Sequence, residues 1–266
     1  MTYQNALRYL DSFYDYEKKP SRKIKFVNLN RIKKLARLFG DPQNTYKTIH
    51  ITGTKGKGST SSLLSNILLQ AGFKVGLYTS PHISDLRERI KINNIEIEKK
   101  ELVRLVQEVK EKLKSLSRPI RVSFFEIFTL IAFNYFKLKN VDFVIFEVGM
   151  GGRFDATNVI NPLACAVTSV SYDHTRELGN RLVDIASEKV EIIKKGTFCI
   201  SAPQNQEVMR IIKSKCLKEK VPFFSVGKDI KYKSRIFSSK EEVFDLKGML
   251  TRYDKLRLRL LGEHQL

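Results

Sequence analysis

The chain has 266 residues, a formal net charge of +20, 42% hydrophobic residues and 10% aromatic residues. This length can bury a large core, and the composition is ordinary for a globular protein. The sequence has no amino-terminal apolar signal and no apolar run of about 18 residues, so it indicates neither export nor a membrane span. Its three cysteines are widely spaced and form no C-x-x-C motif, which favours a cytoplasmic protein with reduced thiols.

Helical and strand-like patterns follow one another along the chain. Two amphipathic helices are predicted at 3–16 and 28–39, and a small hairpin at 89–97 turns at Asn93-Asn94. The other predicted strands are 47–52, 74–79, 141–148, 163–170, 197–201 and 222–226, and the other predicted helices are 57–71, 99–116, 123–138, 181–195 and 205–218. The end of the chain again alternates strand-like segments.

The repeated order of strand and helix predicts an α/β fold with a mostly parallel sheet, flanked by helices and wound by right-handed crossovers. We expect a single domain over residues 1–266. Its parts are a helical segment at 1–45, an α/β core at 46–227 and a small β-rich end at 228–266. Ligands of such sheets bind at the carboxyl ends of the strands, so the residues that follow each strand are the first candidates for function.

Much of the positive charge lies in residues 17–40, which hold nine Lys or Arg residues and one acidic residue. A run of this kind can bind nucleic acid or another polyanion. However, the sequence has no nucleic-acid-binding motif, and aromatic residues do not interleave regularly with the basic ones. We therefore favour a solvated surface and expect no nucleic-acid partner, with a basic NTPase that binds nucleic acid as the alternative.

A glycine-rich segment after the strand 47–52 predicts a phosphate-binding loop. Its residues are Gly53, Thr54, Lys55, Gly56, Lys57, Gly58, Ser59 and Thr60. Small residues let the backbone curl around a phosphate, the following helix presents its positive end, and Lys57 adds a mobile cation. The spacing differs from the common P-loop, which needs Gly at Ile51 and Ser or Thr at Gly58. The segment therefore predicts a site for the phosphates of a nucleoside triphosphate such as ATP.

Oxygen ligands follow other predicted strands. Ser80 follows the strand 74–79, and Glu147 lies near the end of the strand 141–148. Hydroxyl and carboxylate oxygens are the ligands that Mg²⁺ prefers, and in many ATP-using enzymes such a carboxylate binds the metal beside the phosphate loop. His174 follows the strand 163–170. By itself this histidine does not indicate a site, and it is a candidate only because the other predicted residues occupy matching positions.

Five segments, in this order, resemble the folylpolyglutamate synthase and dihydrofolate synthase branch of the Mur ligase superfamily. They are Gly53–Thr60, Thr79-Ser80-Pro81-His82, Phe125-Glu126, Glu147–Asn158 and Asp173-His174. The most specific is Glu147–Asn158, which reads EVGMGGRFDATN. The resemblance implies a Mur ligase central domain with a P-loop NTPase-like fold and an ATP-dependent ligase.

The resemblance also implies roles for individual residues. The loop around Lys57 would hold the ATP phosphates, Ser80 and Glu147 would bind one Mg²⁺, and Glu147 with His174 would bind a second. Lys189 matches a lysine that the family carbamylates. The catalytic set implied is therefore Lys57, Glu147, His174 and Lys189. The segments matching the family's pteroate contacts contribute Ser123, Phe124, Phe125, Glu126, Phe154, Asp155 and Ala156. Packing in the core is the equally weighted alternative for the phenylalanines near residue 125.

The implied reaction adds L-glutamate to dihydropteroate or a folate. A substrate carboxylate attacks the γ-phosphoryl group of ATP, which gives an acyl phosphate and ADP. The amine of glutamate then attacks the acyl phosphate, which forms an amide and releases phosphate. Lys57 and Mg²⁺ would neutralise charge on the transferred group, so most of the catalysis is positioning and electrostatics. The partners expected are small molecules only, with no membrane, and the protein is expected to be a monomer. A ligase for a UDP-muropeptide precursor is the second enzyme alternative.

The chain departs from this family's pattern in three places. Lys55 replaces a usual Asn and adds positive charge beside the phosphates. Glu191 stands where the family has a small residue, and we expect it to pair with Lys189 and oppose carbamylation. The chain also stops at the segment that precedes the family's second domain, so we expect it to bind Mg·ATP weakly and to turn over little by itself.

Overall fold

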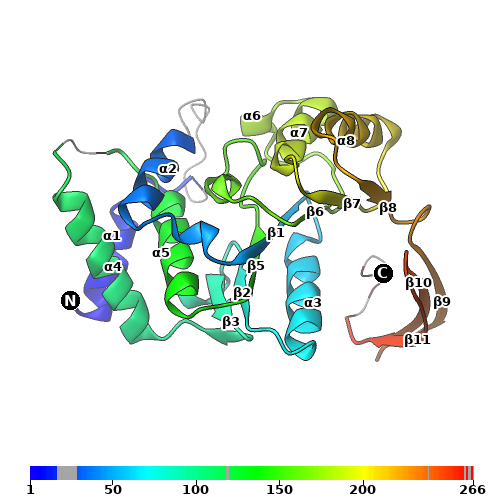
Figure 1. The fold of residues 1–266 in the computed structure, drawn as a ribbon, viewed down its shortest axis with the longest axis horizontal. Helices are drawn as coiled ribbons and strands as arrows, with labels where there is room; N and C mark the ends of the chain where they lie inside the picture. Colours follow the sequence, from blue (N-terminus) through cyan, green and yellow to red (C-terminus); the bar gives the residue numbers. More distant parts are fainter. Residues whose placement is uncertain (17–28, 118–119, 239, 261, 263–264, 266) are drawn as a thin grey trace.

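The structure is a computed structural model that describes residues 1–16, 29–117, 120–238, 240–260, 262 and 265 (Figure 1). The predicted basic run at 17–40 and the start of the helix predicted at 28–39 therefore lie partly outside the described residues. Among the described residues, none of the helices combines the length and apolar character needed to cross a membrane.

An eight-stranded sheet forms the centre of the molecule. Its strands are β1 (Lys47–Thr52), β2 (Val75–Tyr78), β3 (Ile90–Ile92), β4 (Ile95–Glu96), β5 (Phe143–Glu147), β6 (Ala164–Val167), β7 (Phe198–Ser201) and β8 (Phe223–Ser225). Their order across the sheet is β4-β3-β2-β5-β1-β6-β7-β8. All neighbours are parallel except the pairs β2–β3 and β3–β4. This confirms the predicted α/β fold with a mostly parallel sheet.

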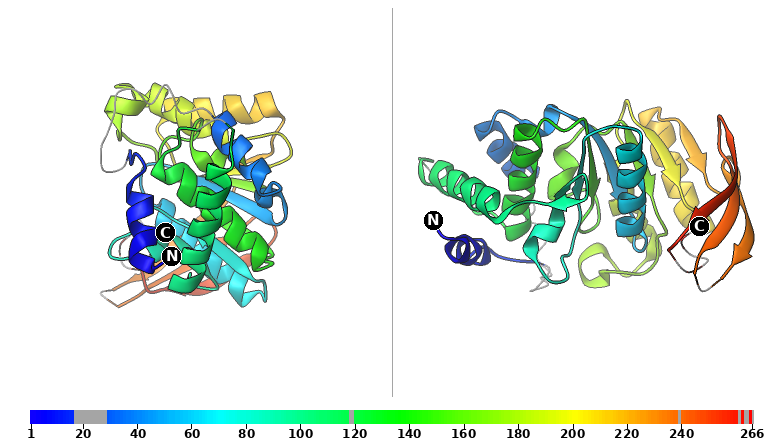
Figure 2. Two further views of the ribbon diagram at one scale, coloured as in Figure 1. Left: turned by 90° about the vertical axis from the view of Figure 1, so that its left-hand side faces the viewer. Right: turned by 90° about the horizontal axis from the view of Figure 1, so that it is seen from below.

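Helices cover both faces of this sheet (Figure 2). They are α1 (Tyr3–Asp11), α2 (Leu29–Leu38), α3 (Lys57–Gln70), α4 (Lys99–Lys114), α5 (Phe124–Leu138), α6 (Thr175–Leu178), α7 (Leu182–Lys189) and α8 (Gln206–Glu219). Alternate side chains of β5 separate the two faces, because successive residues of a strand point to opposite sides. Val144 and Phe146 pack in the core with α5, whereas Ile145 packs in the core with α3. Both faces of β5 are therefore buried, as expected for a central parallel strand.

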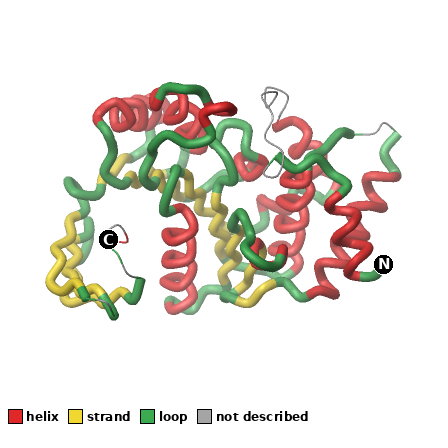
Figure 3. The backbone as a smooth tube through the Cα atoms, turned by 180° about the vertical axis from the view of Figure 1, so that it is seen from behind, coloured by secondary structure: helices red, strands yellow, loops and turns green. Residues whose placement is uncertain are grey.

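A separate three-stranded antiparallel sheet follows β8. It contains β9 (Lys231–Phe237), β10 (Glu242–Lys247) and β11 (Arg252–Leu258), with β10 in the middle. It lies at the opposite end of the molecule from the amino terminus (Figure 3). This agrees with the strand-like alternation predicted near the end of the chain. The division of 1–266 into three parts of one domain stays a prediction.

Two predicted helices differ from the structure. The helix predicted at 3–16 ends at Asp11, and the helix predicted at 181–195 ends at Lys189 and continues as a 3₁₀ turn, Val190–Ile192. The apolar spacing of the second segment continues past Lys189, because Val190, Ile192 and Ile193 are also buried in the core around α7 and α8. The apolar periodicity of this segment therefore predicted its buried residues correctly but predicted too long a helix.

A capping box fixes the start of α5 and with it the wall of the site described below. The Ser123 hydroxyl accepts from the backbone N–H of Glu126 at 3.2 Å, and the Glu126 carboxylate accepts from the backbone N–H of Ser123 at 2.8 Å. Arg31 donates to the same carboxylate at 3.2 Å, and the Glu126 side chain is only 2% exposed. The cap therefore satisfies a buried charge as well as the end of a helix.

We predict that Ser123→Ala destabilises the protein by about 1–2 kcal/mol, because it removes the cap and one donor to a buried carboxylate. Ser115→Ala is a matched control, since Ser115 is exposed and its hydroxyl, among the described residues, bonds only to the nearby Lys112 carbonyl. The control should change the free energy of unfolding by less than about 0.5 kcal/mol. Urea unfolding of both variants measures the difference, and equal effects would contradict the role of the cap.

Candidate functional site

The order of the strands brings the predicted motifs together. The phosphate loop follows β1, Ser80 follows β2, Glu147 ends β5 and His174 follows β6. In the sheet these strands are adjacent, in the order β2-β5-β1-β6, and all four are parallel to one another. Their carboxyl ends therefore meet at one edge of the sheet, which is where ligands bind in open α/β sheets.

The phosphate loop leads directly into α3. Gly56 is the N-cap of this helix and has a φ of 84°, a left-handed conformation that glycine adopts without strain. The backbone N–H groups of Gly56, Lys57, Gly58 and Ser59 precede the first full turn and have no carbonyl of the helix to bond. Together with the positive end of the helix dipole, these donors make a site suited to phosphate oxygens.

The first part of the loop does not share this role. The backbone N–H groups of Thr54 and Lys55 donate to the carbonyl of Ser169, at 2.7 and 3.4 Å. The Thr54 hydroxyl donates to the carbonyl of Ser171 at 3.0 Å. The N–H groups of the segment that remain available to a phosphate are therefore those of Gly56–Ser59. Thr54 and Lys55 instead fasten the loop to the chain after β6.

Two lysines converge on the loop. Lys57 donates to the carbonyls of Gly53 at 3.2 Å and Thr54 at 3.4 Å, and Lys189 from α7 donates to the Gly53 carbonyl at 2.7 Å. The Lys189 side chain is 2% exposed, so it is no ordinary surface lysine. Burial, and then the nearby Lys57 ammonium, lower its pKa to about 8. A fraction of Lys189 is therefore neutral near pH 8, and a neutral amine is the form that reacts with CO₂.

A glycine next to α7 explains how Lys189 reaches the loop. A Cβ atom at Gly152 would lie 2.7 Å from the backbone oxygens of both Glu188 and Lys189. Only glycine permits this close approach of the two backbones. The expected pair of Glu191 with Lys189 is not formed, because Glu191 instead pairs with Arg153 at 3.4 Å and Lys215 at 3.1 Å. This expectation was wrong, since the chain after Lys189 turns into a 3₁₀ segment and directs Glu191 elsewhere.

Glu147 lies beside both Ser80 and the start of α3. Its Oε2 atom accepts from the backbone N–H of Ser80 at 3.2 Å and lies 3.8 Å from where a Cβ of Gly58 would be. The residue is 4% exposed. Burial raises the pKa of the carboxyl to about 7, an effect that the Lys57 ammonium opposes. The site therefore holds a carboxylate that needs further positive charge to stay ionised at neutral pH.

The chemistry of these groups fits a magnesium ion. Among the described residues, no three His, Cys, Asp or Glu side chains form a cluster that could hold a metal. Mg²⁺ does not need such a cluster, because it usually binds one or two protein oxygens and completes its shell with water and substrate phosphates. The neighbouring Ser80 and Glu147 match this kind of site. The second metal expected between Glu147 and His174 stays a prediction.

A cavity of about 620 Å³ opens beside these groups. Ser80, His174 and the glycine segment Gly149–Gly152 line it, with α6 at another wall. Of the predicted substrate contacts, the lining includes Ser123, Phe125, Glu126, Phe154, Asp155 and Ala156. The structure therefore brings six of the seven predicted substrate-contacting residues to one cavity beside the phosphate loop.

Phe124 is the exception. It is 4% exposed and stacks on Phe128 with ring centroids 5.7 Å apart, and the guanidinium carbon of Arg89 lies over the Phe124 ring, 5.4 Å from its centroid. It belongs to the core because it lies on the side of α5 that packs inwards, one turn from Phe128. Phe124 therefore packs in the core, as the alternative interpretation expected, whereas Phe125 lines the cavity.

The predicted carboxylates of the cavity wall are already engaged by their own chain. Asp155 accepts from the backbone N–H groups of Gly149, Met150 and Thr157, at 3.0, 3.1 and 2.9 Å, and from the Thr157 hydroxyl. Burial raises the pKa of Asp155, and these four donors oppose the rise. A substrate that donated to Asp155 would therefore share its oxygen atoms with the backbone N–H groups of the Gly149–Met150 turn. The predicted acceptor role of Asp155 towards a substrate stays a prediction.

Sequence reasoning missed several parts of the cavity. It predicted neither the short helix α6, which contributes Arg176 and Leu178, nor the contribution of Tyr16. A four-residue helix has no periodicity to detect, and Tyr16 borders the basic run. It also missed His50 and Thr157, which lie behind the wall and are linked at 2.8 Å. Only the tertiary structure brings these two residues together.

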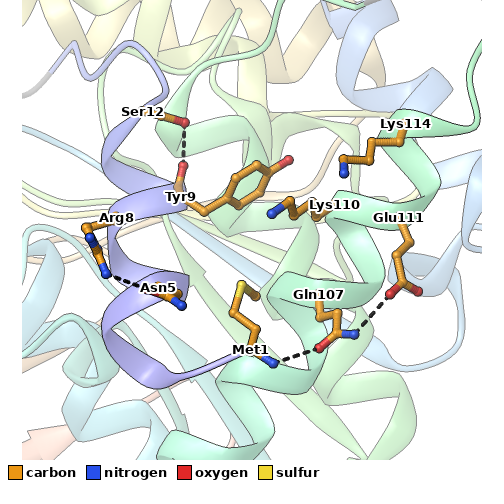
Figure 4. Close-up of a pocket in the computed structure, with 9 residues that line it drawn as sticks. All are labelled: Met1, Asn5, Arg8, Tyr9, Ser12, Gln107, Lys110, Glu111 and Lys114. Carbon is orange, nitrogen blue, oxygen red and sulfur yellow. Dashed lines mark hydrogen bonds between the residues drawn. The ribbon is translucent and has the colours of Figure 1, made fainter.

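A second hollow of about 670 Å³ lies between α1 and α4, away from the predicted motifs (Figure 4). Its basic side chains include Arg8, Lys110 and Lys114. Arg8 bonds to Asn5, and the Lys110 ammonium lies over the Tyr9 ring at 5.2 Å. These side chains interact with neighbours in their own two helices, and the hollow contains none of the predicted site residues.

Comparisons with known proteins agree with this geometry. The family model for the Mur ligase middle domain matches residues 51–266. The chain is 36% identical over 266 residues to the dihydrofolate synthase/folylpolyglutamate synthase of Bacillus subtilis, a match that covers 99% of the chain and 60% of that relative.

Solved structures give the same result. A complex of FPGS with AMPPCP and folate matches with a TM-score of 0.92 and 31% identity, covering 100% of this chain and 64% of that one. The folylpolyglutamate synthase of Thermotoga maritima matches with a TM-score of 0.88 and 35% identity, covering 99% and 58%. The chain thus spans about 60% of the length of these proteins.

The burial of Glu147 predicts a pH-dependent stability. Because its pKa is about 7 in the folded protein and 4.5 ordinarily, the folded state binds the proton more tightly. Stability from this group is complete below pH 4.5 and is lost as the pH rises through 7. In buffer free of metal and nucleotide, the wild type should therefore lose about 2–3 kcal/mol more than Glu147→Gln between pH 5 and pH 8.

Urea unfolding of both proteins at the two pH values measures this difference. Subtracting the two proteins cancels the other titrating groups, and Lys189 contributes little because its pKa of about 8 lies at the edge of the window. Parallel pH profiles for the two proteins would show that the Glu147 carboxyl is not perturbed by burial.

Proposed function

Because the chain belongs to the Mur ligase family, in its folylpolyglutamate synthase and dihydrofolate synthase group, we propose that it supplies the ATP-binding part of an ATP-dependent ligase. Its substrates would be L-glutamate and a pteroate or folate. The observation that carries this proposal is the position of Glu147, buried between Ser80 and the start of α3, with the cavity adjacent. One edge of the sheet thus joins a phosphate site to a cavity for a second molecule.

The residues of the phosphate site have separate tasks. ATP, when bound, supplies the phosphoryl group that activates a substrate carboxylate. The free N–H groups of Gly56–Ser59 orient its phosphates, and Lys57 leaves the Gly53 and Thr54 carbonyls to neutralise their charge. Ser80 and Glu147 would hold Mg²⁺, whose charge would also keep the buried Glu147 carboxyl ionised at neutral pH.

The cavity suits a flat, partly apolar substrate with polar edges. Phe125 and Phe154 offer aromatic faces, while Ser123, Glu126 and Asp155 offer oxygen atoms at its walls. This mixture of apolar surface and few polar groups is typical of small-molecule sites. It supports a pterin ring in the cavity and agrees with the relatives, which are named as dihydrofolate and folylpolyglutamate synthases. The cytoplasmic location, the monomeric state and the absence of nucleic-acid partners stay predictions.

We predict that Lys57→Ala raises the dissociation constant of Mg·AMPPCP roughly tenfold or more, because a charge-assisted contact to phosphate is lost. Lys228→Ala removes an exposed lysine that follows β8, three strands away from β1 in the sheet, and should leave the affinity unchanged. Isothermal titration calorimetry of the three proteins gives the comparison. Equal affinities for all three would mean that the loop is not the phosphate site.

The substrate is tested by ATP-dependent incorporation of labelled glutamate. We expect incorporation into dihydropteroate or tetrahydrofolate, and its loss in Lys57→Ala and Glu147→Gln. The Bacillus subtilis relative, of which the chain spans 60%, gives the reference rate when it is assayed in parallel. Incorporation into a UDP-muropeptide and into neither pterin compound would overturn the assignment of the substrate.

A further inference from the structure

A fully buried histidine lies behind the wall of the cavity. His50 is on β1 with 0% exposure, and its Nε2 atom lies 2.8 Å from the hydroxyl oxygen of Thr157. Its Nδ1 atom has no hydrogen-bond partner among the described residues. Neither residue belongs to the phosphate site or lines the cavity. Burying a polar side chain costs free energy unless the side chain is hydrogen-bonded, so the bond to Thr157 offsets the cost of burying His50.

The hydroxyl of Thr157 sets the direction of this hydrogen bond. It donates its single proton to Asp155, which also accepts from the Thr157 backbone N–H. Since a hydroxyl has one proton, its oxygen can only accept from His50, so the imidazole proton is on Nε2. The opposite tautomer would leave a buried N–H unpaired on Nδ1, whereas this one leaves only a lone pair there.

The charge of His50 is also determined. Burial lowers its pKa well below the ordinary value, and the positive charge of Lys194 adds to this effect. Lys194 itself donates to the carbonyls of Asn158 and Ile160, both at 2.6 Å, and so stays beside the histidine. A second positive charge on the imidazole is therefore unfavourable, and the ring is neutral.

This hydrogen-bond chain ends at the cavity. Asp155 uses its other oxygen to hold the backbone N–H groups of Gly149 and Met150, and all three residues line the cavity. We propose that His50 is a positioning residue: its Nε2–H orients the Thr157 hydroxyl, which keeps Asp155 an acceptor that holds the Gly149–Met150 turn in the shape the substrate needs. The part of this inference that concerns a pterin substrate rests on the proposed function.

The proton position is tested without any ligand. The chain has four histidines, and the signal of His50 in a ¹⁵N-labelled sample is identified by its loss in His50→Gln. We expect the nitrogen shifts of a neutral ring with a proton on Nε2 and a lone pair on Nδ1, unchanged between pH 6 and pH 8. A ring protonated on Nδ1, or on both nitrogens, would overturn the proposed direction of the chain.

Two variants of His50 separate positioning from packing. His50→Gln places an amide donor near the Nε2 position, whereas His50→Leu fills similar space without a donor. With dihydropteroate as the probe, we expect His50→Leu to raise the dissociation constant roughly three- to tenfold and His50→Gln to change it less than about twofold. The affinity for Mg·AMPPCP should stay unchanged in both. Equal effects of the two variants, or none, would show that His50 only fills space.

A second pair covers the case in which His50→Leu does not fold. Thr157→Ser keeps the hydroxyl and should bind dihydropteroate like the wild type, whereas Thr157→Val should bind it as weakly as His50→Leu. Equal binding by both Thr157 variants would overturn the proposal. Failure of the wild type to bind dihydropteroate would instead contradict the proposed substrate, while the nitrogen shifts would still decide where the proton lies.

Discussion

The burial of one carboxylate at the end of β5 is the constraint on which the site depends. Glu147 is held between the Ser80 backbone and the start of α3, where its charge is costly without a cation opposite. Its position follows from the centre of the sheet, because β5 pairs with both β1 and β2. The loops that follow β1 and β2 therefore lie on either side of this carboxyl.

The surroundings of Glu147 balance charge within a small volume. Lys57 and Lys189 both bond to the Gly53 carbonyl, and the Lys57 ammonium adds to the effect of burial in lowering the pKa of Lys189. The Lys57 ammonium favours the Glu147 carboxylate, and bound phosphates would be attracted to both lysines. The site is thus preorganised for a polyanion. Preorganised charges contribute to catalysis because they need no rearrangement during the reaction.

The cavity is built by a different means, from hydrogen bonds to the backbone. Asp155 holds the glycine segment, and the capping box of Glu126 holds the start of α5. Both carboxylates were expected to contact substrate, and both are engaged mainly with their own chain. A motif marks residues that a site requires, and it does not distinguish a group that touches the ligand from one that holds the wall in place. Phe124 and Phe125 show the same limit, because adjacent helical residues face different surroundings.

By itself the sequence determined the fold class and the order of the elements, and it located the glycine turn before α3, because each depends on local spacing: apolar periodicity, a run of small residues, and a residue that follows a strand. The tertiary structure decided which N–H donors of that loop are free. The Ser169 carbonyl, which accepts from the N–H groups of Thr54 and Lys55, is more than a hundred residues away in the sequence. It also decided the partner of Lys189 and the link from His50 to Thr157. These contacts join distant segments, and no local pattern records where a buried side chain finds its partner.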